Sequence, residues 1–403
     1  MTFLTRSSYI DIHDIDKALS ETVAVGGTAK VVKCNFGDGS VVAKIYNKQS
    51  KFDQVRLEAL QVRFAESDLH DRLGIPLKLL SYDGDFIGYT MRYFEQSQYL
   101  SLDNWVEQTL VPKLQPSVIS LKFRLGVLRS LAQLLRELHE RHVAVVDLKP
   151  SNILVRISDG SVQIIDCDSF CILGSNNSIE FATKEVTVGY YSSDALRNGV
   201  PISELSYEQD NFAFSVIAFQ LLNNGLHPYQ GAWQIPLENY NLETLSSQGP
   251  FPYAIEEPNE VKPSRASIHW TFSSQLRGAL DRAFAPGKKR ISVGEWASVI
   301  DELKNNELET CDILRVSPAH QKFKDRLCSA CVYSAYLEKE QSRPNSTVSA
   351  DQNSKSDTSS WMEMNFNPSK QTRGPLFWGA VVSAIILYLI LVSVNISLSV
   401  PPV

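Results

Sequence analysis

The stretch VAVVDLKPSNILV, at residues 143–155, decides the fold. It follows residues 121–142, whose amphipathic periodicity predicts a helix. Between its two apolar runs stand Asp147, Lys149 and Asn152, which can carry chemistry, together with Pro150. An ordinary turn after a helix could contain these residue types by chance. Their order and spacing favour a catalytic or metal-binding loop.

A second segment, SVQIIDCDSF at residues 161–170, ends an apolar, strand-like run in a carboxylate. Asp166 directly follows this run, and Asp168 is a competing candidate two residues later. A carboxylate at a strand end can hold a metal ion that bridges phosphates. The register of the preceding hydrophobic run favours Asp166 as the metal ligand.

Together, the two segments resemble the protein kinase superfamily, whose catalytic loop reads His-Arg-Asp-Leu-Lys-Pro-x-Asn and whose metal-binding motif reads Asp-Phe-Gly. Two pairs of positions depart from this pattern, and they hold Val145 with Val146 and Cys167 with Asp168. The resemblance implies an α+β, bilobal protein kinase-like fold over residues 1–305. Its N-lobe would cover residues 1–95 and its C-lobe residues 96–305.

The resemblance also implies a role for each retained residue. Asp147 would accept or orient the proton of the substrate hydroxyl, and Lys149 would neutralise charge on the transferred phosphoryl group. Asn152 and Asp166 would bind Mg²⁺ through their side-chain oxygens. ATP and Mg²⁺ are the implied cofactors.

Residues 21–34, ETVAVGGTAKVVKC, resemble a degenerate glycine-rich nucleotide loop. The positions matching that loop are Ala24, Gly26, Gly27, Ala29 and Val31. Small residues let backbone amides approach phosphates, but a Gly-Gly hairpin turn explains the segment equally well. The following strand-like VVAKIY carries Lys44, where a kinase holds the α- and β-phosphates. An isolated strand lysine is usually just solvated, and the position of this one between loop and helix favours the functional interpretation.

Two further parts of the nucleotide site follow Lys44. The lysine requires a carboxylate partner from the helix predicted over residues 51–64, where Glu58 is the best-placed candidate and Glu66 the second. The later run FIGYTMRYF resembles the last N-lobe strand before a hinge. There, backbone groups near Arg92 and Tyr93 would receive adenine.

Later landmarks agree in order with the same family. Residues 182–196 resemble the end of an activation segment. Asp210, at the start of an apolar helix, matches the aspartate that holds the catalytic-loop backbone. Asp194 would pair with Arg290 in a buried ion pair, and loss of one partner would cost roughly 3–5 kcal/mol.

A cysteine- and histidine-containing segment, residues 306–338, follows the last kinase helix. Its candidate ligands for a structural zinc ion are Cys311, His320, Cys328 and Cys331, spaced C-x8-H-x7-C-x2-C. The alternative is two unrelated thiols on a surface turn beside an ordinary histidine. With the variant catalytic motifs, this segment resembles bacterial kinase-like proteins encoded with tellurite-resistance von Willebrand A proteins. That resemblance implies von Willebrand A-type and phosphatase partners.

The C-terminal part changes in composition. Residues 339–373 are too poor in large apolar side chains to fold alone, which predicts a disordered linker. Residues 374–400 predict a transmembrane helix, because the 23 positions from 376 to 398 cover roughly 34 Å as a helix. A buried core helix is the alternative. Lys370 and Arg373 precede the span, and this positive charge predicts a cytoplasmic kinase domain on a cell membrane.

Composition gives no support for a nucleic-acid-binding protein or a secreted, disulfide-bonded one. A net charge of −6 and a pI near 5.7 give no sign of nucleic-acid binding. Six scattered cysteines and the absence of a signal-like N-terminus predict that the main body works in a reducing cytosol.

The expected function is that of a membrane-anchored serine/threonine protein kinase, because Lys149 and Pro150 after Asp147 resemble the Ser/Thr pattern more than the tyrosine pattern. A catalytically weak or inactive pseudokinase, acting as a nucleotide-binding membrane scaffold, is the rival. The four departures from the kinase motifs and the missing glycines of the loop favour it. The complete set of Lys44, Asp147, Asn152 and Asp166 opposes it. Phosphorylation of a small molecule is a third interpretation that no residue excludes.

Overall fold

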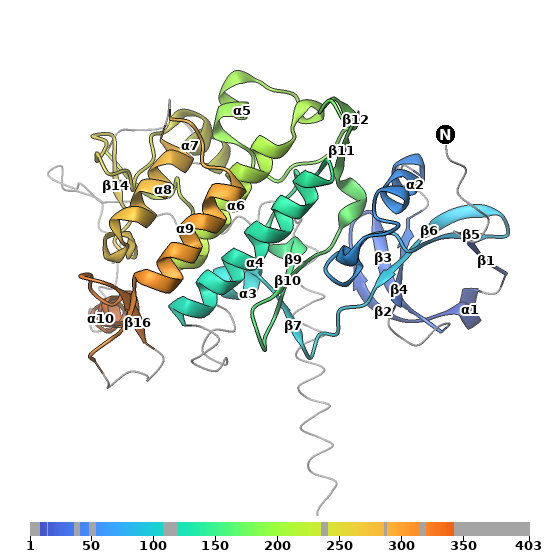
Figure 1. The fold of residues 1–403 in the computed structure, drawn as a ribbon, viewed down its shortest axis with the longest axis horizontal. Helices are drawn as coiled ribbons and strands as arrows, with labels where there is room; N and C mark the ends of the chain where they lie inside the picture. The colour runs from blue at the N-terminus through green and yellow to red at the C-terminus, as the bar shows by residue number, and fades with distance from the viewer. Residues whose placement is uncertain are drawn as a thin grey trace, which may run out of the picture. The chain divides into compact units, whose positions relative to one another are not determined.

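The computed structural model describes residues 9–13, 15–35, 41–47, 54–107, 120–234, 241–285, 288–313 and 320–341. These residues belong to one compact unit, within residues 1–361. Figure 1 shows a sheet-rich N-lobe joined to a larger helical C-lobe, which confirms the predicted bilobal α+β fold. The predicted transmembrane segment and most of the predicted linker lie outside the described residues. Within the described part, no helix is both long and apolar enough to cross a membrane.

The N-lobe is built on a six-stranded sheet in the order β1-β5-β6-β4-β3-β2. Its strands are β1 (Tyr9–Ile12), β2 (Leu19–Val25), β3 (Ala29–Cys34), β4 (Val41–Tyr46), β5 (Lys78–Tyr82) and β6 (Asp85–Arg92). Neighbours run antiparallel except β1, which is parallel to β5. The short α1 (Ile15–Ala18) and the ten-residue α2 (Gln54–Arg63) complete the lobe.

One glycine of β6 allows the close packing of the central strands. A Cβ atom on Gly88 would lie 2.0 Å from the carbonyl oxygen of Lys44 on β4. Any larger residue would therefore push β4 away at the point where it carries Lys44. The sheet thus fixes the backbone of that lysine by a steric requirement of its neighbour.

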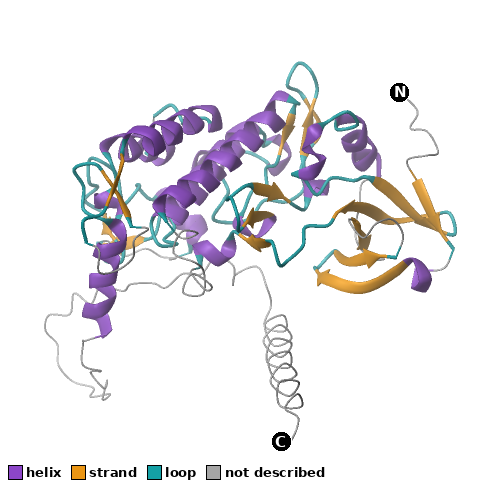
Figure 2. Cartoon of the chain, turned by 60° about the horizontal axis from the view of Figure 1, so that its bottom comes forward, coloured by secondary structure: helices purple, strands orange, loops and turns teal. Residues whose placement is uncertain are grey.

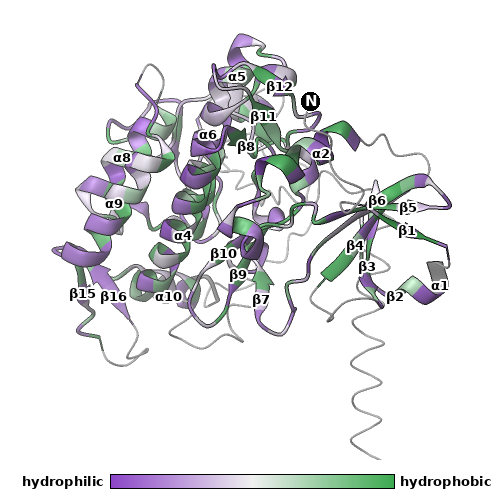
Figure 3. Ribbon diagram, turned by 45° about the vertical axis from the view of Figure 1, so that its right-hand side comes forward, coloured by the Kyte–Doolittle hydropathy of each residue, from purple (hydrophilic) through white to green (hydrophobic). Residues whose placement is uncertain are grey.

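The C-lobe is built around α6 (Tyr207–Leu222), which is buried along nearly its whole length. A mostly apolar helix without a polar face is stable only inside a core, and α6 follows that rule. Around it lie α3 (Asp103–Val106), α4 (Leu121–Glu140), α5 (Ser193–Asn198), α7 (Leu242–Gln248), α8 (Ser274–Phe284) and α9 (Val293–Asn306). In Figure 3, α4 and α9 alternate between hydrophobic and hydrophilic residues, as expected for helices with one face on the core and one in water.

Short strands frame the loops between the lobes, and Figure 2 shows them apart from the large N-lobe sheet. They form the three-stranded sheets β10-β9-β7 and β12-β11-β8. Their bounds are β7 (Tyr99–Ser101), β8 (Val143–Ala144), β9 (Ile153–Arg156), β10 (Val162–Ile164), β11 (Cys171–Leu173) and β12 (Ile179–Phe181). A two-stranded sheet, β13 (Gly231–Trp233) with β14 (Val261–Pro263), lies further along the chain.

After α9 the chain forms a hairpin of β15 (Leu308–Thr310) and β16 (Gln321–Phe323), followed by α10 (Ser329–Gln341). Phe323 is buried in the main C-lobe core, and the hydroxyls of Ser329 and Thr271 lie 2.6 Å apart. The hairpin and α10 therefore pack on the C-lobe. Residues 339–341, predicted as disordered linker, belong to α10, which continues to Gln341.

Candidate active site

The catalytic loop closes a hydrogen-bonded triangle around Asp147. Its Oδ1 accepts hydrogen bonds from the amide of Thr187 at 2.8 Å and from the hydroxyl of Thr187 at 2.7 Å. Its Oδ2 accepts from Nζ of Lys149 at 2.7 Å, and this Nζ also donates to Oγ1 of Thr187 at 2.9 Å. Asp147 is buried. The segment containing Thr187 therefore fixes the carboxylate beside the lysine predicted to neutralise the phosphoryl group.

The backbone before Asp147 is held by Asp210, in the first turn of α6. The fully buried carboxylate accepts the amide of Val145 at 2.9 Å and the amide of Val146 at 2.7 Å. Nε2 of His139 lies 2.9 Å from Oδ2 of Asp210. These contacts confirm the structural role predicted for Asp210.

Asn152 and Asp166 lie at neighbouring strand ends. Asn152 immediately precedes β9, Asp166 lies two residues beyond the end of β10, and the two strands pair. The amide of Ile165 donates to the carbonyl of Asn152 at 2.9 Å, which brings the two candidate metal ligands together. Nδ2 of Asn152 donates to the carbonyl of Asp147 at 3.2 Å, and among the described residues its side-chain oxygen has no partner. The Asp166 side chain is 45% exposed.

Strand β4 brings Lys44 to the same place. Its Nζ forms ion pairs with Asp166 and, at 2.7 Å, with Oδ1 of Asp168. Burial lowers the pKa of Lys44, but the carboxylates of Asp168 and Asp166 outweigh this effect and raise that pKa well above its ordinary value. For Asp168 the directions are reversed. Burial raises the pKa of its carboxyl, but the charge of Lys44 and the hydrogen bond from the Tyr46 hydroxyl outweigh burial and hold that pKa below its ordinary value. Lys44 and Asp168 are therefore both charged near neutral pH.

The predicted carboxylate partner from α2 does not contact Lys44. Glu58 accepts a hydrogen bond from the Tyr9 hydroxyl of β1 and another from Nε2 of Gln54 at 3.2 Å. The second candidate, Glu66, lies in the turn beyond the end of α2. Glu58 does not reach Lys44, because the face of α2 that meets the site carries the residue two positions before it. Residues two positions apart in a helix do not share a face.

That residue is Arg56, which was not predicted from the sequence. Its buried side chain donates from Nη1 to the carbonyl of Ser169 at 3.3 Å and to the carbonyl of Phe170 at 3.4 Å, and from Nη2 to the carbonyl of Ala182. The sequence places Arg56 between Val55 and Leu57 and four residues before Leu60, and this spacing could have indicated the register.

The glycine-rich segment is the turn of a hairpin between β2 and β3. The amide of Gly26 donates to the carbonyl of Ala29 at 2.8 Å, and Ala24 pairs with Val31 across the hairpin. A Cβ atom on Gly27 would meet nothing within 4 Å, so this face of the turn is open. A nucleotide loop and an ordinary Gly-Gly hairpin turn would both have this hairpin. Only contact between the turn and a phosphate would distinguish the two interpretations.

The predicted hinge residues lie at the end of the sheet. Arg92 is the last residue of β6 and forms an ion pair with Asp71 at 2.8 Å. Tyr93 follows it in the connection from β6 to β7. The strand therefore leads into the inter-lobe connection as predicted, while the contact with adenine remains a prediction.

The activation-segment ion pair between Asp194 and Arg290 is present, but it is less buried than predicted. The Arg290 side chain is 10% exposed, whereas that of Asp194 is 53% exposed. Arg290 also lies over the ring of Phe212, 4.8 Å from its centroid. Water around Asp194 weakens the pair, so the predicted cost of 3–5 kcal/mol for losing one partner is too high.

A separate group of side chains gathers between β15, β16 and α10. One potential ligand atom from each of Cys311, His320, Cys328 and Cys331 lies within 4.8 Å of the others. Sγ of Cys331 is 3.8 Å from Sγ of Cys311 and 3.6 Å from Nδ1 of His320. The structure thus brings together all four residues that the spacing predicted. Cys167 and Cys171 lie in the active-site region, outside this group.

Comparison with known proteins agrees with this geometry. The model of the protein kinase domain family matches residues 19–295, and the chain therefore belongs to the protein kinase family. The chain is also similar to Protein kinase YegI of Escherichia coli (strain K12), with 28% identity over 209 residues, covering 49% of this chain and 31% of that protein. Protein kinase YegI of Escherichia coli O157:H7 is 27% identical over 209 residues. The aligned part spans about a third of the length of these curated relatives.

Proposed function

We propose that this protein is a serine/threonine protein kinase that transfers the γ-phosphoryl group of ATP to a protein hydroxyl. The observation that carries the proposal is the contact of Lys149 and Thr187 with Asp147, beside the pair Asn152 and Asp166. This arrangement joins a base, a cation and two metal-binding side chains at one point between the lobes. A scaffold that binds nucleotide without chemistry needs no such base.

The oxygen donors fit Mg²⁺, which prefers oxygen ligands. Asn152 offers a side-chain oxygen without a partner among the described residues, and Asp166 offers a half-exposed carboxylate. Bound with ATP, Mg²⁺ would neutralise charge on the β- and γ-phosphates. Lys44 would hold the phosphates under the turn containing Gly26 and Gly27, and Arg92 and Tyr93 would present backbone groups to adenine.

In this proposal Asp147 orients the substrate hydroxyl and accepts its proton. Lys149, 2.7 Å from that carboxylate, places positive charge where the phosphoryl group arrives. The Thr187 amide and hydroxyl keep the carboxylate from rotating away. The chain supplies orientation and charge at fixed points, which is the main catalytic requirement of phosphoryl transfer.

Transfer of radiolabelled phosphate from ATP by the full-length protein tests this proposal, with Asp147→Asn as the matched variant. Loss of a general base lowers turnover by roughly 10²–10⁴-fold. Equal incorporation of label by both proteins would contradict the catalytic proposal and favour the pseudokinase. Label recovered in a small molecule rather than in protein would redirect it to the third interpretation.

We also propose that residues 374–400 span the cell membrane and hold the kinase domain in the cytoplasm. Support comes from the uncharged sequence of that segment and from Lys370 and Arg373 before it. The resemblance to kinase-like proteins encoded with von Willebrand A proteins supports such proteins and phosphatases as partners. Recovery of the full-length chain in carbonate-washed membranes is expected, and its recovery in the supernatant would refute the anchor.

The Cys/His group supports the further proposal of a structural zinc ion. Around tetrahedral zinc, with Zn–S near 2.3 Å and Zn–N near 2.05 Å, two thiolates lie about 3.8 Å apart and a thiolate and an imidazole nitrogen about 3.6 Å apart. The observed separations from Sγ of Cys331 are 3.8 Å to Cys311 and 3.6 Å to His320. A disulfide would need about 2.05 Å, so this spacing suits a shared metal rather than a bond between the thiols.

Zinc would hold the hairpin and α10, which have little core of their own, in one shape on the C-lobe. Elemental analysis of the full-length protein is expected to find about one zinc per chain. Cys328→Ser and Cys331→Ser should lose it, whereas Cys34→Ser, in the N-lobe sheet, should keep it. Absence of zinc from the unchanged protein after purification without chelators would refute the site.

A further inference from the structure

Lys44 is held by acidic residues that follow β10, with no contribution from α2. One of them is Asp168, whose two oxygens are both in use. Oδ1 accepts from Nζ of Lys44 at 2.7 Å, and Oδ2 accepts from the hydroxyl of Tyr46 at 2.5 Å. Lys44 and Tyr46 stand two positions apart on β4 and so project from the same face of the strand. Asp168 therefore ties its own segment to one face of β4.

Asp166 and Asp168 differ in exposure, although both reach Lys44. The Asp168 side chain is 14% exposed, and the Asp166 side chain is 45% exposed. A carboxylate enclosed by a lysine and a tyrosine hydroxyl has few lone pairs left for a metal ion. The more open Asp166 keeps that capacity. The two carboxylates thus suit two different tasks.

Helix α2 carries the opposite charge on the face that meets this segment. Arg56 is 4% exposed and holds the carbonyls of Ser169 and Phe170, which directly follow Asp168. Glu58 points instead to Tyr9 and Gln54. A kinase normally orients its phosphate-binding lysine with a helix glutamate. Here α2 contributes Arg56, whose guanidinium holds the backbone that follows Asp168. The carboxylate that contacts Lys44 belongs to Asp168 in that same segment.

We propose that Asp168 is the positioning residue for Lys44, in place of a glutamate of α2. The proposal rests on the proposed nucleotide site and deepens it. When a nucleotide with Mg²⁺ enters, Asp166 turns to the metal and Asp168 keeps Lys44 directed at the phosphates. The position of the Lys44 side chain then depends on the segment that Arg56 fixes, rather than on a carboxylate of α2.

Binding of ADP to the full-length protein, measured by calorimetry with Mg²⁺ and again with the metal chelated, tests this proposal. Lysine–phosphate contact needs no metal, so Asp168→Asn is expected to weaken ADP binding about tenfold in both conditions. Asp168→Glu should recover part of the loss. Tyr46→Phe, which removes one hydroxyl contact to Asp168, should weaken binding about threefold. Asp68→Asn removes a charge from an exposed residue of the short 3-10 helix Asp68–Asp71 and serves as the matched control.

Three results would overturn the proposal. The first is unchanged ADP affinity in Asp168→Asn together with a loss in Glu58→Gln, which would return the role to the helix. The second is a loss in Asp168→Asn only when Mg²⁺ is present, which would make Asp168 a metal ligand. The third is absence of ADP binding by the unchanged protein, which would also remove the nucleotide site. Absence of phosphate transfer with the predicted ADP pattern intact would instead refute only the catalytic activity.

Discussion

Val146 occupies a backbone conformation that costs energy. Its φ is 61°, in the left-handed region that a β-branched residue rarely adopts. The buried carboxylate of Asp210 takes the amides of Val145 and Val146, one on each oxygen. Hydrogen bonds to a charged acceptor are stronger than neutral ones and offset the strain of this turn. The position of Asp147 therefore depends on a residue that performs no chemistry.

Asp210→Asn is expected to lower the free energy of unfolding by about 3 kcal/mol, because the new amide turns one donor toward a buried backbone donor. Urea denaturation of the full-length protein measures this change. ADP affinity should be kept, since the nucleotide contacts lie elsewhere. A loss smaller than about 0.5 kcal/mol would show that solvent or a shifted backbone satisfies the two amides.

At the scale of single residues, sequence reasoning succeeded where a motif fixes order and spacing. Asp147, Asn152 and Asp166 came from such motifs, and the structure brings them together. The partner of Lys44 could not be found in this way, because it depends on which face of α2 meets the site. That register is set by packing of Arg56 against a segment more than 100 residues away.

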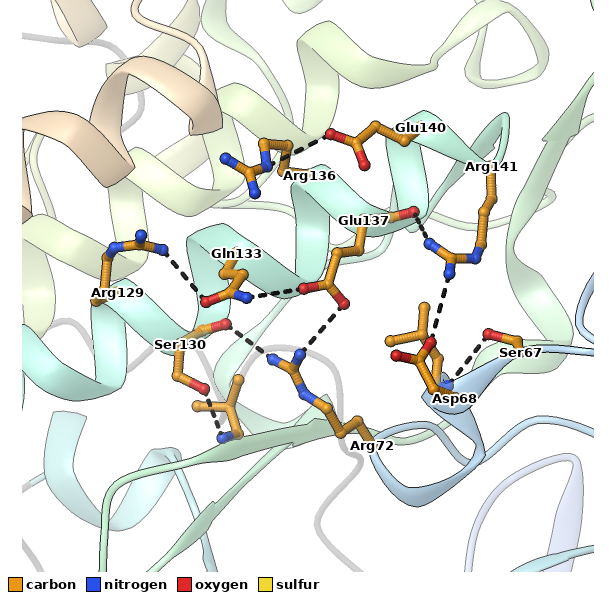
Figure 4. Close-up of polar contacts among 12 residues, drawn as sticks. Ser67, Asp68, Arg72, Arg129, Ser130, Gln133, Arg136, Glu137, Glu140 and Arg141 are labelled. Carbon is orange, nitrogen blue, oxygen red and sulfur yellow. Dashed lines mark hydrogen bonds and ion pairs between the residues drawn. The ribbon is translucent and has the colours of Figure 1, made fainter.

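At the scale of elements, helix α4 contacts the N-lobe and leads into the catalytic loop. Figure 4 shows its side chains meeting the segment between α2 and β5. Arg72 donates to Glu137 at 3.3 Å and to the carbonyl of Ser130 at 3.2 Å. The carbonyl of Arg72 also accepts the amide of Ile164 on β10 at 3.0 Å. One N-lobe residue thus contacts both the helix before the catalytic loop and the strand before Asp166.

Arg72→Ala should lower the free energy of unfolding by about 1–3 kcal/mol, since a partly buried carboxylate and a carbonyl lose a charged donor. Thermal or urea unfolding provides the measurement. The matched control is Arg136→Ala on α4, whose contact with Glu140 is an exposed pair at 3.5 Å. That control should change stability by less than about 0.5 kcal/mol. Equal effects in both variants would contradict a connecting role for Arg72.

Helices and strands were predictable where periodicity is strong. The amphipathic pattern at residues 121–142 corresponds to α4, and the capping box of Ser292 with Glu295 starts α9. The cysteine spacing identified the ligand set, but it could not show that α10 continues to Gln341. Helix ends depend on local capping and packing, which a ligand pattern does not encode.

For the molecule as a whole, buried histidines limit stability in acid. Burial lowers the pKa of His227 to about 4, from an ordinary 6.5. Its Nε2 lies 2.7 Å from the carbonyl of Gly189, and Nδ1 accepts the amide of Tyr229 at 3.3 Å. The ring therefore fits its site in the neutral form, with the proton on Nε2. Protonation of Nδ1 would break the contact with Tyr229.

Between pH 6.5 and about 4 the unfolded chain binds a proton at His227 that the folded chain does not. Stability therefore falls as the pH falls through this window, by up to roughly 3 kcal/mol from this residue, and its contribution levels off below the folded pKa. Urea unfolding at about pH 7 and about pH 5 measures the slope. His227→Gln should be less stable near neutrality but lose less on acidification. An identical slope in both proteins would refute the assignment.

The pairing of Lys44 with two carboxylates has a consequence for the choice of an inactive control. Replacing the phosphate-binding lysine by methionine would leave Asp166 and Asp168 facing each other without their shared cation. Like charges so close disfavour ionisation and destabilise the fold. Such a variant would mix misfolding with lost chemistry, and its failure in an assay would be uninterpretable. Asp147→Asn keeps the shape of the side chain and leaves the Lys44 pair untouched, and unfolding measured beside the assay accounts for the contacts with Lys149 and Thr187 that it alters.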